Sequence, residues 1–488
     1  MKRTLILNLS ILLIVNLVIK PIYLFGIDRN VQLQLGTENY GIYFHLLNFT
    51  LILQVINDFG LQNFTVRHLS QNRAVFGEYF QKIGFIKLIF SFIYILAVIL
   101  IFNLASYDSN LFIFTLHLTF NQIIISGISY FRSTLAGIGD YKSDSILSGL
   151  DRSLLIIMLG AVLLNPEWRS SLSISMFIGF QTISLLISFG IAYAILKIKN
   201  IHFSFHVYSW AEIRPILLFC FPFTLIYLFN ILYQKIDNIL IEKLLTNGHY
   251  ENGVYAASMR LFEAGSMVSL SFGSLLLGMF AYLTIKKSEL KALFELSVTI
   301  LLIISLMLSA SVSFYSDEVN QLLYYKNDPY WNNILMFTMI AFLPASINYI
   351  FGAYFQGINK EVFLLKLYGF AAIINIGINL ILIPMFQILG AALANLITQF
   401  FLLSTQLILV HRDLRLSSVQ LINWLLITVI FVLVFGIFKY FVSFHYMINI
   451  ALSIFCGVIL LLVFRLVPVA EILQFMKNKL NRNEHREA

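Results

Sequence analysis

Residues 80–102 read FQKIGFIKLIFSFIYILAVILIF, a stretch of apolar side chains with two lysines in its first half. A helix needs about 20 mostly apolar residues to cross the hydrocarbon core of a bilayer. Stretches of this kind follow one another from Thr4 to about Pro468, and the segments between them are too short to hold a soluble domain. We therefore predict an all-α, polytopic membrane protein with about fourteen membrane-spanning helices.

The bulk composition agrees with this class. Apolar residues make up 59% of the chain and charged residues only 11%, a balance foreign to water-soluble domains of this size. The net charge of +8 is spread over short loops without a block of Lys and Arg, so no nucleic-acid partner is expected. The predicted spans are 4–26, 41–66, 80–102, 111–138, 145–165, 172–196, 214–241, 253–283, 291–315, 332–357, 361–385, 388–410, 420–442 and 446–467.

Lysine and arginine are distributed unequally among the loops. If the N-terminus is cytoplasmic, that side carries 22 of the 32 cationic residues, against six on the opposite side. Because loops rich in Lys and Arg stay on the cytoplasmic side of a membrane, we expect both termini in the cytoplasm.

Two short sequences occur twice. Thr37-Glu38-Asn39-Tyr40-Gly41-Ile42-Tyr43 returns as His249-Tyr250-Glu251-Asn252-Gly253-Val254-Tyr255, and Ala136-Gly137-Ile138 returns as Gln356-Gly357-Ile358. Both pairs are six spans apart, which predicts a parallel duplication, an arrangement found in secondary transporters. The expected organisation is a six-helix lobe at 1–200, a second six-helix lobe at 201–415, two further helices at 416–468 and a cytoplasmic tail at 469–488.

Three signatures follow one another along the chain. They are Leu35-Gly36-Thr37-Glu38-Asn39-Tyr40-Gly41-Ile42-Tyr43, then Asp237-Asn238-Ile239 followed by Gly253-Val254-Tyr255-Ala256-Ala257, and finally Ile383-Pro384 leading to Gly390-Ala391-Ala392-Leu393-Ala394. Together they resemble the polysaccharide flippases of the O-antigen translocase (Wzx) type. These flippases belong to the multidrug/oligosaccharidyl-lipid/polysaccharide exporter superfamily.

The resemblance has consequences for fold and function. It implies two six-helix bundles around a central cavity plus two peripheral helices, in the inner membrane of a bacterium. It also implies transport of an oligosaccharide on undecaprenyl pyrophosphate, such as an O-antigen, capsule or exopolysaccharide repeat unit, from the inner to the outer leaflet by alternating access. A polymerase and a chain-length regulator of the same pathway are the protein partners it suggests, beside membrane lipids.

Charged residues inside the spans are the candidate site residues. An ionised group at the centre of a membrane costs about 2.5 to 3.5 kcal/mol on insertion scales, so it needs a partner or an aqueous cavity. Arg260 and Glu263 lie three residues apart on one helical face and can pair. We predict that Arg260, helped by Lys20, binds the diphosphate in the cavity while Glu263 orients Arg260 or takes part in ion coupling; a structural Arg260–Glu263 pair is the alternative.

The other charged residues carry weaker expectations. Lys87, Arg152 and Asp151 lie close to the cytoplasmic side, where gating or structural salt bridges are the favoured interpretation. Asp58 is in Asn57-Asp58-Phe59-Gly60, where a helix break is expected, so a cap, a cavity-lining role and ion binding all stay open. Lys235 and Asp237 form either an exposed interfacial pair or part of an ion-coupling site. Within the spans four cations stand against three anions, Asp58, Asp151 and Glu263, a small excess that favours a diphosphate over a cationic drug.

Several chemistries have no support in the sequence. His45 and His117 lack ligand neighbours, so no metal site is expected, and no phosphate-binding ATPase motif occurs. A polymerase would present a larger outer catalytic loop, so an enzyme is not expected. The predicted function is a flippase for lipid-linked oligosaccharides without a bound cofactor, with coupling to H⁺ or Na⁺ left open. The alternative is an ion-coupled exporter of drugs or other small molecules from the same superfamily.

Overall fold

The structure, a computed structural model, describes residues 18–62, 64–65, 76–201, 206–284 and 287–466. Every regular element in these ranges is a helix. Twelve of the helices are long and apolar enough to cross a membrane. They coincide with the last twelve predicted spans, which confirms an all-α, multi-pass membrane protein. Of the first predicted span, 4–26, residues 4–17 lie outside the described part of the chain.

The second predicted span, 41–66, corresponds to a shorter and more polar helix. Helix α3 covers Thr37–Asp58 and is not among the twelve candidates, because buried polar side chains such as His45, Asn48 and Asn57 interrupt its apolar sequence. It ends at the expected break, where Phe59 and Gly60 both have positive φ. Before it, the chain is helical through η2 (Ile22–Asp28) and α2 (Arg29–Leu35), beyond the predicted end of the first span.

The described chain divides into two compact units. Unit 1 comprises Met1–Ser271 and Asn359–Thr398, and unit 2 comprises Phe272–Ile358 and Gln399–Ala488. The division falls inside α11 (Gly248–Leu283) and α16 (Ile388–Leu414). The predicted lobes at 1–200 and 201–415 follow another division of the chain and remain predictions.

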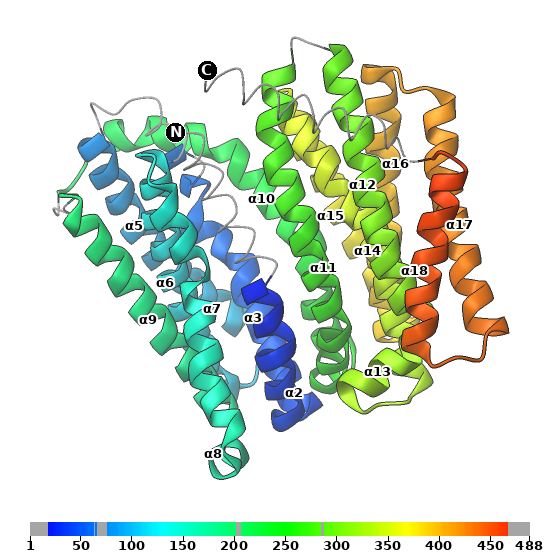
Figure 1. The fold of residues 1–488 in the computed structure, drawn as a ribbon. Coiled ribbons are helices and arrows are strands. Elements are labelled where there is room, and N and C mark those ends of the chain that lie inside the picture. The colour runs from blue at the N-terminus through cyan, green and yellow to red at the C-terminus, as the bar shows by residue number, and fades with distance from the viewer. Residues whose placement is uncertain (1–17, 63, 66–75, 202–205, 285–286, 467–488) are drawn as a thin grey trace. The chain divides into compact units, whose positions relative to one another are not determined.

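Unit 1 contains η2, α2, α3 and the helices that pack around them. α3 contacts α5 (Phe76–Leu104), α6 (Phe112–Gly137) and α10 (Trp210–Leu244), as Figure 1 shows. α9 (Ile174–Ile198) packs on α6 and α7 (Tyr141–Leu164), and α15 (Glu361–Phe386) packs along α10. The short elements η4 (Ser109–Leu111) and α8 (Pro166–Ser170) lie between longer helices.

Unit 2 is built on α14 (Pro329–Gly357). In its apolar 18-residue stretch 72% of the residues are buried, against 22% for α18 (Tyr446–Val463), so α14 is the core helix and α18 is peripheral. α12 (Lys287–Phe314) packs on α14 and on α17 (Ser418–Phe441), and α13 (Ser316–Tyr324) packs on α14.

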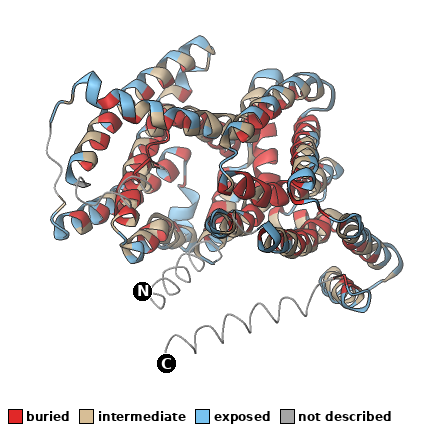
Figure 2. Ribbon diagram, turned by 90° about the horizontal axis from the view of Figure 1, so that it is seen from above, coloured by how far each residue is buried: buried red, intermediate tan, exposed pale blue. Residues whose placement is uncertain are grey.

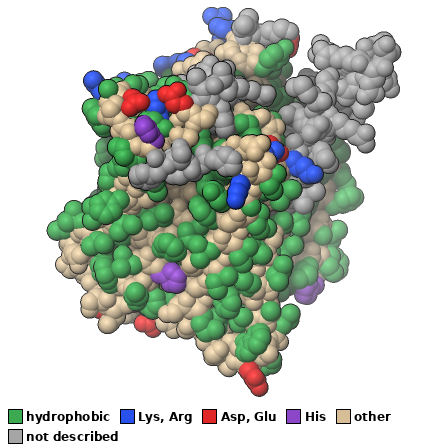
Figure 3. All heavy atoms as spheres, turned by 90° about the vertical axis from the view of Figure 1, so that its left-hand side faces the viewer, with side chains coloured by type: hydrophobic (Ala, Val, Ile, Leu, Met, Phe, Trp, Pro, Cys, Tyr) green, Lys and Arg blue, Asp and Glu red, His purple; other side chains and the backbone are tan. Residues whose placement is uncertain are grey.

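The outward surface of the helices is apolar. On α5, for example, Leu88, Phe92 and Leu96 are exposed while Tyr94 and Val98 are fully buried, so both faces of this helix are hydrophobic. Figure 2 shows the same alternation of buried and exposed stripes along other helices. In the face drawn in Figure 3 hydrophobic side chains form a broad band, with most Lys and Arg side chains above it. This is the surface expected of helices that contact lipid.

Two equivalent glycines meet where α3 and α11 begin. A Cβ on Gly41 would overlap the backbone oxygen of His249, and a Cβ on Gly253 would overlap the backbone oxygen of Thr37. Thr37 and Gly41 have the same places in the first repeated sequence as His249 and Gly253 in the second. The contact is therefore reciprocal, as between segments related by a two-fold axis. The duplication itself stays a prediction, but this close approach brings α11 against α2 and α3.

Candidate functional site

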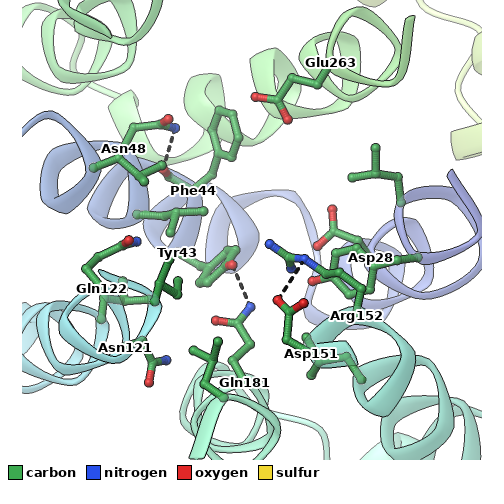
Figure 4. A pocket seen from close by; sticks show the side chains of 18 of the residues that line it. Asp28, Tyr43, Phe44, Asn48, Asn121, Gln122, Asp151, Arg152, Gln181 and Glu263 are labelled. Atoms are coloured by element: carbon green, nitrogen blue, oxygen red, sulfur yellow. Dashed lines mark hydrogen bonds and ion pairs between the residues drawn. The ribbon is translucent and has the colours of Figure 1, made fainter. Parts of the chain in front are cut away.

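Unit 1 contains a cavity of about 320 Å³ (Figure 4). Side chains from η2, α3, α6, α7, α9, α10 and α11 line it. The charged lining residues are Asp28, Asp151, Arg152, Lys235 and Glu263. Charged groups inside a membrane-spanning bundle mark substrate or ion pathways by default, so we take this cavity as the candidate site.

Arg260 is held behind the cavity by Asp28. Its Nε and Nη2 atoms donate to Asp28 Oδ2 at 2.9 and 2.7 Å, and Nη1 donates to Gln32 Oε1 at 2.7 Å. The hydroxyl of Tyr40 donates to the same Asp28 oxygen at 2.8 Å. The Arg260 side chain is only 2% exposed and does not line the cavity. These contacts fix α11 to η2 and α2. They also occupy the N–H donors with which the Arg260 guanidinium would otherwise bind a phosphate.

Gln32 completes this cluster. Its Nε2 donates to the backbone oxygen of Gly253 at 2.8 Å, directly at the crossing of α3 and α11. Asp28, Gln32 and Tyr40 were not among the predicted site residues, because the sequence placed Asp28 in a loop after the first span. A signal was present: Asp28 and Gln32 are four residues apart and lie on one face of a continuing helix.

Glu263 pairs with Lys235 and not with Arg260. Lys235 Nζ lies 2.5 Å from Glu263 Oε1, and the two side chains are 21% and 37% exposed. Both line the cavity. The predicted Arg260–Glu263 pair is therefore wrong: a residue three positions away was a weaker partner for Arg260 than the buried Asp28 on another helix.

Asp237 is separated from Lys235 and completely buried. It accepts hydrogen bonds from the Tyr255 hydroxyl at 3.0 Å and from Asn379 Nδ2 at 2.7 Å. Asn379 also contacts Asn375, whose amide donates to Thr398 Oγ1 at 3.2 Å. The prediction of an exposed Lys235–Asp237 pair is thus wrong. Side chains two positions apart on a helix point to different sides, so Lys235 faces the cavity while Asp237 is buried. Within the described chain, Asp237 forms no ion pair with a Lys or Arg.

Arg152 and Asp151 contribute the charge on the α7 side of the cavity. Arg152 Nε lies 3.5 Å from Asp151 Oδ2, and the Arg152 side chain is 36% exposed. Its guanidinium carbon lies 4.6 Å from the centre of the Tyr23 ring. Figure 4 shows Arg152 extending toward Asp28 and Asp151 from α7. Arg152 is therefore the arginine that reaches the cavity, although the sequence favoured a gating or structural role.

Lys87, Asp58 and Lys20 lie away from the cavity lining. Lys87 is buried on α5, where its Nζ lies 3.4 Å from Asp58 Oδ1 and 2.6 Å from Ser126 Oγ. Lys20 is half-buried and makes no ion pair with another residue that the structure describes. The described residues contain no cluster of His, Cys, Asp and Glu that could hold a metal ion.

The cavity changes the charge comparison made from the sequence. With Lys235, Asp28 and Asp237 counted, the cations Lys20, Lys87, Arg152, Lys235 and Arg260 stand against an equal number of anions, Asp28, Asp58, Asp151, Asp237 and Glu263. The excess of positive charge that favoured a diphosphate over a cationic drug therefore disappears. What separates the cations is their exposure: Arg152 and Lys235 reach the cavity, while Lys87 and Arg260 are enclosed by their partners.

Charged and polar side chains around a cavity within membrane-crossing helices are typical of a secondary transporter. A family profile described as "Polysaccharide biosynthesis protein" matches residues 7–280, and the chain belongs to this family. Curated protein sequences contain no significant match.

Solved structures share the fold. The inward closed conformation of the lipid II flippase MurJ aligns over 95% of this chain and 98% of its own, with a TM-score of 0.66 and 14% identity. The inward-facing conformation of a multidrug resistance MATE family transporter of the MOP superfamily aligns over 85% and 99%, with a TM-score of 0.63 and 16% identity. At 14% and 16% identity these alignments show that the chain shares the fold of both proteins.

Proposed function

We propose that this protein is a flippase that carries oligosaccharides linked to undecaprenyl pyrophosphate across the bacterial inner membrane by alternating access. The observation that carries the proposal is the cavity of a polysaccharide biosynthesis protein that presents Arg152 and Lys235 within a bundle of membrane helices. A diphosphate entering such a place loses water, and fixed cations with N–H donors compensate for that loss. The polymerase and chain-length regulator of the pathway are the partners we expect.

In this proposal the cavity cations have separate roles. Arg152 and Lys235 bind the diphosphate, because their side chains are partly exposed at the cavity and each is held by a single described carboxylate. Arg260 positions α11 through Asp28 and Gln32. Lys20, in the first span, interacts electrostatically with Arg152 and Asp151 and adds positive charge near the diphosphate.

Asp237 is the residue we propose for ion coupling. A fully buried carboxylate without a cationic partner is costly when ionised, so uptake of H⁺ or Na⁺ there lowers the free energy of the state that binds the ion. The Tyr255 hydroxyl and the Asn379 amide donate to Asp237, so the carboxylate oxygens of Asp237 are the groups that bind H⁺ or Na⁺ in this proposal. Loss of the ion gradient should then slow transport.

The orientation that we propose places both termini in the cytoplasm, supported by the excess of Lys and Arg in the loops of that side. A reporter fused after Asp108 or Asn327 should behave as extracytoplasmic, and one after Asn200 or Ser288 as cytoplasmic. Any of the four on the opposite side would contradict the orientation.

Complementation tests the function. A strain that lacks its flippase but keeps the glycan pathway should regain surface polysaccharide when it expresses this chain. Arg152→Gln should lose this activity at normal membrane abundance, and Arg152→Lys should regain part of it because the charge remains without the fork. Full activity of Arg152→Gln would remove this residue from the site. Resistance to cationic drugs without complementation of any strain would favour the exporter.

A further inference from the structure

Amide side chains line the part of the cavity that lies away from its arginine. Asn48 comes from α3, Asn121 and Gln122 from α6, and Gln181 from α9. In Figure 4 Asn48, Asn121 and Gln122 stand on the left, and Asp28, Asp151 and Arg152 stand on the right. The cavity therefore has a charged end and a neutral, polar end.

Three of these amides are buried and incompletely paired. Asn48, Asn121 and Gln122 are only 1%, 2% and 1% exposed. Asn48 Oδ1, Asn121 Nδ2 and Gln122 Oε1 have no hydrogen-bond partner among the described residues. Buried polar groups are nearly always paired, and leaving one unpaired is costly. Three such atoms on two adjacent helices of one cavity point to a ligand that supplies the missing bonds.

The hydrogen bonds that these amides do form show which of their polar atoms remain available to a ligand. Asn48 Nδ2 donates to the backbone oxygen of Phe44 at 2.8 Å, so the carbonyl of this amide is the available group. Thr182 Oγ1 donates to Asn121 Oδ1 at 2.7 Å, so the NH₂ of Asn121 is available. Gln181 Nε2 donates to the Tyr43 hydroxyl at 2.7 Å and holds that ring at the cavity wall. The available atoms are thus two carbonyl oxygens, those of Asn48 and Gln122, and one NH₂ group, that of Asn121.

This combination of acceptors and a donor selects the chemistry of the ligand. A phosphate offers acceptors almost exclusively and would oppose the two amide carbonyls. An apolar drug would leave all three amide atoms unpaired. A sugar hydroxyl is both donor and acceptor, so neighbouring hydroxyls on a ring can satisfy carbonyl and NH₂ groups together.

We propose that Asn48, Asn121 and Gln122 form a subsite for the carrier-proximal sugar, next to the diphosphate at Arg152 and Lys235. This inference rests on the proposed function, and it adds the direction in which the substrate lies and the residues that discriminate among glycans. The volume agrees, because about 320 Å³ is near the lower end of the roughly 300–1,000 Å³ typical of ligand pockets. Such a cavity holds the diphosphate and a sugar or two, while the rest of the glycan extends beyond it.

Binding to the full-length protein in lipid nanodiscs tests the subsite. The probes are undecaprenyl pyrophosphate alone, the same carrier with one N-acetylglucosamine, and the same carrier with one galactose. The wild type should bind at least one glycosylated carrier about tenfold more tightly than the bare carrier, as expected for two or three added hydrogen bonds. In N48L/N121L/Q122M this ratio should fall close to one.

Two further variants separate the subsite from general effects on folding. Arg152→Gln should weaken all three carriers and leave the ratio as in the wild type. Gln406→Met is a matched control, because Gln406 is fully buried in unit 2 with both side-chain polar atoms unpartnered among the described residues and lies outside the cavity. It should retain the wild-type ratio. If the triple variant fails to fold, Asn121→Leu and Gln122→Met alone should each lower the ratio partly.

The outcomes are distinguishable. A triple variant that keeps the wild-type ratio, or a wild type that binds the bare and glycosylated carriers equally, would overturn the sugar subsite and leave the flippase proposal intact. A Gln406→Met variant that loses the ratio would also overturn it. A wild type that binds none of the three carriers would contradict the proposed function itself.

Discussion

Two aspartates of unit 1 are buried in opposite ways. Asp28 is 7% exposed and accepts two hydrogen bonds from Arg260 and one from Tyr40. Asp237 is 0% exposed and accepts from a hydroxyl and an amide, without an ion pair to any described cation. The first cluster carries its own counter-charge, whereas the second does not.

The difference separates a structural role from a functional one. A compensated pair has no reason to exchange protons or ions, so the Asp28–Arg260 cluster is suited to fixing α11 against η2 and α2. An uncompensated buried carboxylate gains most from binding H⁺ or a metal cation. Burial of a charged residue therefore does not by itself identify a functional residue. The presence or absence of a partner of opposite charge separates the two roles.

The largest effect is expected for Arg260→Met. This variant leaves Asp28 buried without its counter-charge, which costs about 3–5 kcal/mol of folding free energy. Thermal unfolding of the purified protein in detergent should show a clearly lower midpoint. The double variant Asp28→Asn/Arg260→Met removes both charges and should recover most of the loss. An Arg260→Met variant as stable as the wild type would contradict the structural role of the Asp28–Arg260 pair.

Asp237→Asn should behave in the opposite way. It keeps the shape of the side chain and removes an uncompensated charge, so the unfolding midpoint at neutral pH should stay equal or rise. Transport should lose its dependence on the H⁺ or Na⁺ gradient. Asp58→Asn is the matched control, since it strands the buried Lys87 and should lower the midpoint. Gradient-dependent transport by Asp237→Asn would exclude this residue from coupling.

The Lys235–Glu263 pair should matter less for stability. Both side chains are partly exposed, and such pairs contribute about 0–1 kcal/mol. Lys235→Gln should therefore shift the unfolding midpoint far less than Arg260→Met. It should nevertheless weaken binding of undecaprenyl pyrophosphate, because Lys235 lines the cavity. Unchanged binding of this lipid would restrict the diphosphate site to Arg152.

The smallest effect is expected outside the spans, at Asp140. Burial disfavours its ionised form, but Lys199 at 2.7 Å and two hydrogen bonds from Ser143 outweigh this and lower the pKa of Asp140. The ionised pair thus stabilises the fold above the ordinary pKa of about 3.9, and the contribution is lost as pH falls through the lowered value. Asp140→Asn keeps a good helix N-cap. Its midpoint should lie slightly below the wild-type value at pH 7, and the difference should vanish in strong acid; a constant difference would contradict this.

The sequence predicted most of the helices because apolar runs of membrane-crossing length depend on local composition alone. Residues 80–102, for example, lie within α5, and residues 420–442 coincide with α17 except for the last residue. The prediction failed where polar residues serve packing inside unit 1. α3 contains His45, Asn48 and Asn57, and the helical segment before it extends through Asp28 to Leu35.

Partners of the charged residues were harder to predict, since they come from distant parts of the chain. Arg260 selects Asp28 through the approach of α11 to η2, which depends on the contact between Gly41 and Gly253. A search along one helix could propose only Glu263. The amide subsite was likewise invisible in the sequence, because Asn48, Asn121 and Gln122 meet only after α3 and α6 have packed together.

The most direct test of the central claim is transport in proteoliposomes. The full-length protein is reconstituted with a labelled glycosylated undecaprenyl pyrophosphate, and the fraction of label that reaches the opposite leaflet is measured against time. Wild-type protein should move the lipid faster than empty liposomes, and the double variant R152Q/K235Q should fall to the background rate at equal incorporation. Transport by the double variant at the wild-type rate, or no transport by the wild type, would contradict the account.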